Sequence, residues 1–159
     1  MYKRQYENLG PDTGGDISTS EIEITENLKY FVNEFDSEME IVLYTMEPTH
    51  WFTTSTISRA FPNVSLGAPW WLNDNPFGME KHLQQVTNVD LFYNLAGMVT
   101  DSRKLMSYSS RTEMFRRTLA NVVGRQVDRG RMPYSVAADL VAHVSYYGCL
   151  LYTSPSPRD

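Results

Sequence analysis

The sequence has one cysteine, Cys149, in 159 residues. A single cysteine excludes an internal disulfide and any cysteine-based zinc cluster, because both need at least two thiolates. Chains without disulfides are typical of reducing compartments, so we expect a cytoplasmic protein.

The sequence also lacks an excess of positive charge and any long apolar run. Its 14 Lys and Arg against 19 Asp and Glu give a net charge of −5, whereas nucleic-acid binding requires a basic patch. The apolar stretches are much shorter than the roughly 18 residues of a membrane helix, and no apolar segment of a signal peptide follows Lys3 and Arg4. We therefore expect neither nucleic acid nor a membrane as a partner.

A glycine-rich phosphate loop is missing as well, because the glycines of residues 10–15 are not followed by Lys and Ser or Thr. Aromatic residues, in contrast, make up 13% of the chain, with three Trp and ten Tyr. The apolar share of 42% and the charged share of 21% are ordinary for a folded globular protein.

The two ends of the sequence differ in character from the middle. Residues 1–5 and 149–159 resemble translated sequencing-adapter strings, and the second string is polar and rich in proline. We interpret both as adapter-derived, so that residues 6–148 are a segment of a longer gene and Cys149 is not native. The alternative for residues 149–159 is a native disordered tail.

Apolar periodicity in the middle predicts strands that alternate with helices, which is typical of α/β folds with a parallel sheet. The strands are apolar at successive positions, which favours burial on both faces. Phe31 and Val136 fall on the apolar faces of the first and last helices, so we expect both to point inward. Such a chain is either a small open α/β domain or part of a larger barrel, because a complete (β/α)₈ barrel needs roughly 200 residues or more. The predicted strands cover residues 39–46, 63–67 and 94–99, and the predicted helices cover 24–35, 51–60, 79–89, 111–129 and 135–147.

Polar and aromatic side chains follow each predicted strand. Active sites of parallel α/β folds lie at the carboxyl ends of the strands, so these side chains are candidates for a site. They are Glu47 and His50 after the first strand, Trp70 and Trp71 after the second, and Asp101 and Arg103 after the third.

Asp101 and Arg103 place an acid and a cation within one short loop. The guanidinium group would lower the pKa of Asp101 and keep its carboxylate ionised. An ionised aspartate can act as a general base or as a metal ligand. The alternative is an aspartate that only caps a helix or forms a turn.

Trp70 and Trp71 allow two interpretations. An indole in a loop can pack against the apolar face of a sugar ring, but tryptophan is also common in cores. His50 follows a strand end and is open to a site role or a structural one. His82 and His143 belong to no metal-binding spacing, and we expect them to be structural or at the surface.

Four stretches, residues 9–16, 70–79, 95–103 and 107–117, resemble motifs of the glucuronate (uronate) isomerase family. They read LGPDTGGD, WWLNDNPFGM, LAGMVTDSR and SYSSRTEMFRR, and they occur in the order found in that family. The resemblance extends from about Leu9 to Tyr147. It implies a distorted (β/α)₈ barrel of the amidohydrolase superfamily, of which residues 6–148 would be the C-terminal part, with about three strand–helix units and a final helix pair.

The resemblance also implies an activity and a site. The family interconverts D-glucuronate with D-fructuronate and D-galacturonate with D-tagaturonate. Asp101 would be the aspartate of the last strand, which approaches a divalent metal such as zinc and helps to move a proton between C2 and C1. Arg103 would contact the hexuronate substrate and orient that carboxylate, and Trp70 and Trp71 would line the sugar site. The resemblance also leaves open whether the protein forms a homo-oligomer.

Some residues depart from the family pattern. Leu72 and Gly15 stand where the family has phenylalanine, and the string around Glu47 and His50 differs from the family string, which leaves the roles of both residues open. The H-x-H metal ligands of the family are absent from this sequence, so we expect the chain alone to be inactive. Two alternatives are a metal-dependent hydrolase of the same superfamily, with Asp101 activating a metal-bound water, and a non-catalytic sugar-binding module.

Overall fold

The computed structural model describes residues 24–35, 39–45, 48–69, 73–89 and 92–148. The predictions for Glu47, Trp70, Trp71 and the stretch of residues 9–16 fall outside these ranges. The two end segments, 1–5 and 149–159, also lie outside them. Within the described ranges, none of the helices combines the length and the apolar character needed to cross a membrane.

The sheet of the described chain is small and parallel. Strand β1 (Ile41–Leu43) pairs with β2 (Val64–Leu66), with Ile41 opposite Val64 and Leu43 opposite Leu66. All three residues of β2 are buried, whereas those of β1 are half-buried. The prediction of burial on both faces is therefore confirmed for β2 and wrong for β1, which is the edge strand of the described two-stranded sheet.

The third predicted strand, 94–99, is reduced to one parallel bridge between Leu66 and Leu95. The backbone N–H of Ala96 donates to the carbonyl of Leu66 at 2.8 Å. Gly97 follows at φ 73°, a backbone conformation that ends the regular pairing. The segment nevertheless continues the order of the sheet, so that β2 lies between β1 and Leu95.

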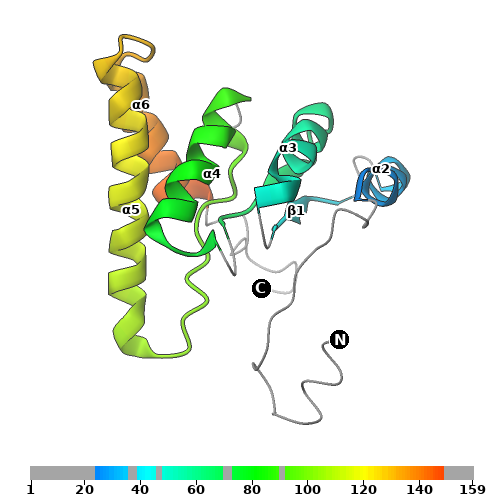
Figure 1. Cartoon of the computed structure of the whole chain (residues 1–159), viewed down its shortest axis with the longest axis horizontal. Coiled ribbons are helices and arrows are strands. Elements are labelled where there is room, and N and C mark those ends of the chain that lie inside the picture. Colours follow the sequence, from blue (N-terminus) through cyan, green and yellow to red (C-terminus); the bar gives the residue numbers. More distant parts are fainter. Residues whose placement is uncertain (1–23, 36–38, 46–47, 70–72, 90–91, 149–159) are drawn as a thin grey trace, which may run out of the picture.

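Successive helices lie side by side along the sheet (Figure 1), from α2 through α3 and α4 to α5, with α6 packed against α5. The described ranges also contain the short 3₁₀ turns η1 and η3 and the π-helical turn η4. The elements are α2 (Ile24–Glu34), η1 (Pro48–His50), α3 (Trp51–Ala60), α4 (Pro76–Asn88), η3 (Phe92–Asn94), α5 (Leu105–Asp128), α6 (Tyr134–Ala142) and η4 (His143–Tyr147).

Local signals at its N-terminus explain where α4 begins. The side chain of Asn75 accepts hydrogen bonds from the backbone N–H groups of Phe77 and Gly78 at 3.1 and 3.0 Å. Pro76 occupies the first helical position, where its missing N–H needs no partner. These signals start the helix three residues before the predicted residue 79.

The long helix α5 begins at Leu105, six residues before the predicted start at 111. Leu105 and Met106 are 84% and 88% exposed, so the first turn carries no buried face that periodicity would detect. The helix ends as predicted near Gly130, which adopts φ +68° and donates its N–H to the carbonyl of Val127 at 2.8 Å.

The core consists of two clusters. The larger one joins β2, α4, α5 and α6, and its fully buried members include Met79, Leu83, Leu95, Phe115, Leu119, Leu140 and Val144. The smaller one contains Val32, Ile57 and Val64, and Leu43 packs against both clusters. The inward orientation predicted for Phe31 and Val136 is wrong, because they are 41% and 40% exposed and only their helix neighbours pack inward.

A polar network ties the third segment to the sheet. Asn94 donates from Nδ2 to the carbonyl of Val64 at 2.7 Å and to the hydroxyl of Ser58 at 3.1 Å. Its Oδ1 accepts from the hydroxyl of Ser65 at 2.8 Å. One amide side chain thereby connects η3, β2 and α3, and this fixes how the chain enters the loop that carries Asp101.

Candidate functional site

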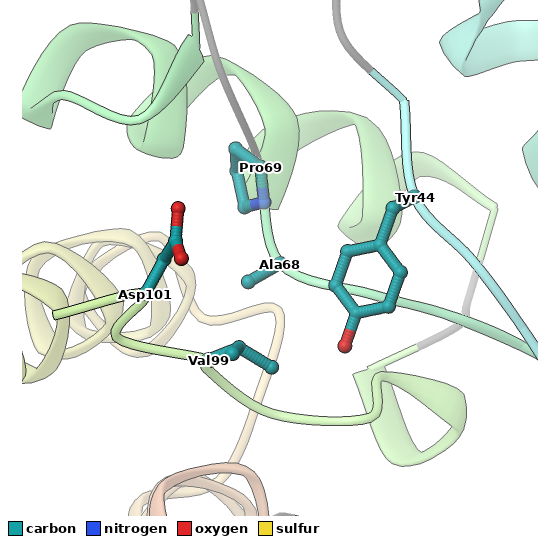
Figure 2. A pocket seen from close by; sticks show the side chains of 5 residues that line it. All are labelled: Tyr44, Ala68, Pro69, Val99 and Asp101. Carbon is teal, nitrogen blue, oxygen red and sulfur yellow. The ribbon is translucent and has the colours of Figure 1, made fainter. Parts of the chain in front are cut away.

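A cavity of about 350 Å³ lies at the carboxyl ends of the parallel segments. Its lining comes from three places: Tyr44 directly after β1, Ala68 and Pro69 after β2, and Val99 and Asp101 after the bridge at Leu95. Figure 2 shows the Asp101 side chain and the Tyr44 ring on opposite sides, with Ala68 and Val99 between them. The volume falls within the range of small-molecule pockets.

Tyr44 reaches this position because a glycine lies beside it. A Cβ atom on Gly67 would lie 2.3 to 2.5 Å from atoms of the Tyr44 ring, so a larger residue would displace the ring. The N–H of Gly67 also donates to the carbonyl of Leu43 at 2.8 Å. The missing side chain at the end of β2 therefore makes room for the aromatic wall of the cavity.

Asp101 has an unusual backbone conformation. Its φ is +46°, and it is the one non-glycine residue with positive φ among the described residues. Aspartate tolerates this region better than most residues, yet the conformation still costs roughly 1–2 kcal/mol. Strain of this kind persists only where neighbouring groups fix the backbone, and it concentrates at functional sites. The carboxyl group is exposed to solvent at the wall of the cavity.

Arg111 contacts the loop that carries Asp101 and the segment before α4. Its Nε donates to the carbonyl of Thr100 at 2.5 Å, and its terminal nitrogen forms an ion pair with the carboxylate of Asp74. The side chains of Arg111 and Asp74 are 26% and 18% exposed, so this pair is partly shielded from water. It joins the segment before α4 to the loop that carries Asp101.

The segment around Asp74 is itself held tightly. The N–H of Asn75 donates to the carbonyl of Asn73 at 2.8 Å, and the Asn73 side chain is buried. A Cβ on Gly78 would lie 2.4 Å from the Asn73 carbonyl oxygen, which explains the glycine at that position. Much of the motif at residues 70–79 therefore builds a rigid turn into α4.

The structure brings together only part of the predicted site. Asp101 lines the cavity, whereas Arg103 lies exposed two residues further on and is not among the described residues that form the wall. Trp70 and Trp71 lie outside the described residues, directly after the lining residue Pro69, and Glu47 also lies outside them.

His50 and His82 are buried in the packing of α3 and α4. His50 is 7% exposed and is absent from the described lining of the cavity. Burial lowers the pKa of His82 to about 4, and its ring meets the Trp51 ring edge-on with 5.2 Å between centroids. Nδ1 of His82 has no hydrogen-bond partner in the part of the chain that the structure describes. His82 therefore lies in the packing between α3 and α4, and the structural role expected for it stays a prediction.

Sequence reasoning missed two features of the site. The first is Tyr44, which falls inside the predicted strand of residues 39–46, although β1 ends at Leu43. A shorter strand would have put this tyrosine at a strand end. The second is the contact of Arg111 with Asp74, which are 37 residues apart. No local pattern indicates a contact of that kind.

The described residues offer little for a metal. No group of three or more His, Cys, Asp and Glu side chains lies close enough together within them to hold a metal ion. Asp101 supplies one exposed carboxylate at the cavity, and a carboxylate suits a divalent cation. Any such cation would therefore need further ligands from outside the described residues.

Comparisons with known proteins agree on one family. A family model described as glucuronate isomerase matches residues 1–152. The uronate isomerase of Thermotoga maritima is 64% identical over 143 residues, which are 90% of this chain and 32% of that protein. The uronate isomerase of Oceanobacillus iheyensis is 33% identical over 160 residues, covering 94% of this chain and 34% of that protein.

Solved structures give the same result. A crystal structure of the Thermotoga maritima uronate isomerase superposes with a TM-score of 0.86 at 62% identity, covering 92% of this chain and 32% of that one. A glucuronate isomerase from Caulobacter crescentus superposes with a TM-score of 0.84 at 27% identity, covering 93% and 32%. The chain thus spans about a third of the length of the relatives that it matches. The match over nearly the whole chain, in sequence and in structure, shows that this chain belongs to the glucuronate isomerase family.

Proposed function

We propose that this chain forms part of a hexuronate isomerase and contributes one wall of its active site. The whole enzyme would be a (β/α)₈ barrel, of which the described elements supply the C-terminal strand–helix units. The observation that carries the proposal is the carboxylate of Asp101 at the cavity formed by consecutive strand ends, in a chain of the glucuronate isomerase family.

The proposed reaction interconverts D-glucuronate with D-fructuronate, and D-galacturonate with D-tagaturonate. An aldose–ketose shift needs a base that removes the proton from C2 and returns it to C1, while the hydroxyl proton moves from O2 to O1. Asp101 would act as this base, because its carboxylate lies on a mostly apolar wall beside Val99 and Ala68. The proton that leaves C2 is delivered to C1, so the step needs no external oxidant or reductant.

The substrate carries its own carboxylate, which the charge of Asp101 would repel. Arg103, on the same loop, would pair with the substrate and orient Asp101, because a guanidinium group binds a carboxylate through two parallel hydrogen bonds. Trp70 and Trp71 follow Pro69 of the cavity wall and would cover the apolar face of the sugar. The Tyr44 ring would close the opposite side.

When bound, a divalent cation such as zinc would supply Lewis-acid polarisation of the sugar oxygens. Asp101 would be one of its ligands. The other ligands would come from outside the described residues, since these contain no group of three or more metal-binding side chains close together.

The proposal is tested with a hybrid enzyme, defined as the Thermotoga maritima uronate isomerase in which the 143 matched residues of this chain replace the corresponding segment. We expect the hybrid to interconvert D-glucuronate and D-fructuronate, followed by ¹H NMR. Asp101→Asn should reduce kcat by about 10²-fold or more with little change in the unfolding temperature, because general base catalysis contributes 10²–10⁴-fold.

The matched control is Asp139→Asn, which changes an exposed aspartate on α6. Equal turnover of the Asp101→Asn and Asp139→Asn hybrids would refute the role of Asp101. Hydrolysis of a lactone or amide without isomerisation would favour a hydrolase, and sugar binding without turnover would favour a binding module.

A further inference from the structure

Arg111 links the loop that carries Asp101 to the segment that enters α4. It lies in the second turn of α5 and contacts Thr100 on one side and Asp74 on the other. Neither partner is a near neighbour in sequence, since they are 11 and 37 residues away. Two other ion pairs of α5, Arg117 with Glu113 and Arg125 with Glu80, are more exposed and do not contact a cavity loop.

The contact with Thr100 acts directly on the backbone of Asp101. The carbonyl oxygen of Thr100 and the N–H of Asp101 belong to one rigid peptide plane. A guanidinium that holds this oxygen therefore restricts rotation about the φ of Asp101, which is held at +46°. Without that contact, the loop would relax toward a negative φ and the carboxylate would change direction.

Asp74 gives Arg111 a fixed orientation. It lies in the turn into α4, where Asn75 caps the helix and Gly78 packs against the backbone of Asn73. The planar guanidinium can serve an ion pair and a carbonyl at once, because its donors point in fixed directions. The rigid turn before α4 is thereby linked to the loop that carries Asp101.

We propose that Arg111 is a positioning residue, which holds the Thr100–Asp101 peptide so that the Asp101 carboxylate faces the cavity, with Asp74 orienting the guanidinium. This inference rests on the proposed function in one respect, namely that Asp101 moves the proton. Arg111 itself need not touch the substrate.

The test compares separate single variants of the hybrid enzyme, namely Arg111→Lys and Asp74→Asn. Arg117→Lys, on the exposed face of α5, is the matched control. Lysine keeps the positive charge but lacks the planar guanidinium group with its fixed donor directions. We expect Arg111→Lys to reduce kcat by roughly 10- to 100-fold, as misplacement of a reacting group does. KM should stay within about threefold, because substrate contacts are kept. Arg117→Lys should match the parent hybrid.

Two further measurements separate positioning from general stability. Hydrogen exchange in the peptide covering residues 98–104 should rise roughly tenfold in Arg111→Lys, because a hydrogen bond to a charged group is lost, while α4 stays protected. Added guanidinium chloride, below the concentration that unfolds the protein, should restore part of the kcat of Arg111→Ala.

The outcomes decide between the proposals. Unchanged kcat in Arg111→Lys, or unchanged exchange at residues 98–104, would overturn the positioning role. A loss of kcat that follows the loss of thermal stability, with no rescue by guanidinium, would overturn it as well. If the unsubstituted hybrid folds but does not isomerise hexuronates, the proposed function fails, and the exchange experiment still decides the role of Arg111.

Discussion

Acidification should destabilise this fold through His82. The imidazole is 4% exposed between α3 and α4, and burial lowers its pKa from 6.5 to about 4. In the unfolded chain the same imidazole has a pKa of about 6.5. The unfolded state therefore binds more protons than the folded state between these two values, and stability falls as the pH falls.

The expected magnitude follows from the two pKa values of His82, 6.5 and about 4. A tenfold difference in proton affinity between the folded and unfolded states corresponds to about 1.4 kcal/mol, so the full loss, reached below pH 4, is about 3 kcal/mol. At pH 5 the loss is about 2 kcal/mol, and above about pH 7 it vanishes because His82 is neutral in both states. A loss of this size is a substantial part of the total stability of an ordinary domain.

Urea unfolding followed by circular dichroism, from about pH 8 to pH 5, measures this effect for the chain and for His82→Gln. Glutamine cannot be protonated in this range, so the pH dependence of the variant should lack the contribution of one proton. The comparison at pH 8 isolates the packing change, since no protonation of His82 contributes there. A constant difference in stability between the two proteins from pH 8 to pH 5 would refute the reasoning.

Two further substitutions test the local structure by the same measurement. Asn94→Leu removes the hydrogen bonds to Val64, Ser58 and Ser65 and leaves buried polar groups unpaired, so we expect the free energy of unfolding to fall by about 2–4 kcal/mol. The control Asn88→Leu, at an exposed position, should change it little. A loss below about 0.5 kcal/mol in Asn94→Leu would contradict the role of this network. Asn75→Ala removes the N-terminal cap of α4 and should lower the free energy of unfolding by about 1 kcal/mol, whereas Asn75→Asp should keep most of that stability. Equal losses in both variants would show that the cap contributes nothing.

The helices could be predicted where their buried faces carry the signal. The predicted bounds of α3 match the observed ones, because apolar residues begin at Trp51 and Phe61 with Pro62 ends the pattern. The first turn of α5 escapes prediction because Leu105 and Met106 face solvent. Periodicity reports which face is buried, so it does not detect a helical turn without such a face.

The strands are harder to predict because their pairing depends on neighbours. The apolar run at 94–99 indicates a strand, yet Leu95 forms a single bridge and Val99 is 50% exposed. Apolar composition gives the tendency to be buried, while a strand also needs a partner along its length. The same argument explains why β1 is less buried than β2.

The candidate site could be predicted in part. Asp101 follows from its place after an apolar run, and the cavity confirms that it lies at a wall between strand ends. The positive φ of Asp101 and the contact from Arg111 depend on how distant segments pack. Residues 70–79 stand out in the sequence for their tryptophans, and the structure shows that Asn75 and Gly78 of the same motif build the turn into α4.

The division of the core into two clusters has a kinetic consequence. Helices α5 and α6 are joined by a short turn at Gly130, so their contacts close small loops, whereas the pairing of β1 with β2 must first span all of α3. Contacts between residues near in sequence form faster than distant ones. Folding should therefore begin in the larger cluster around Leu119 and reach Val32 last, with Leu43 as the residue through which the second cluster is recruited.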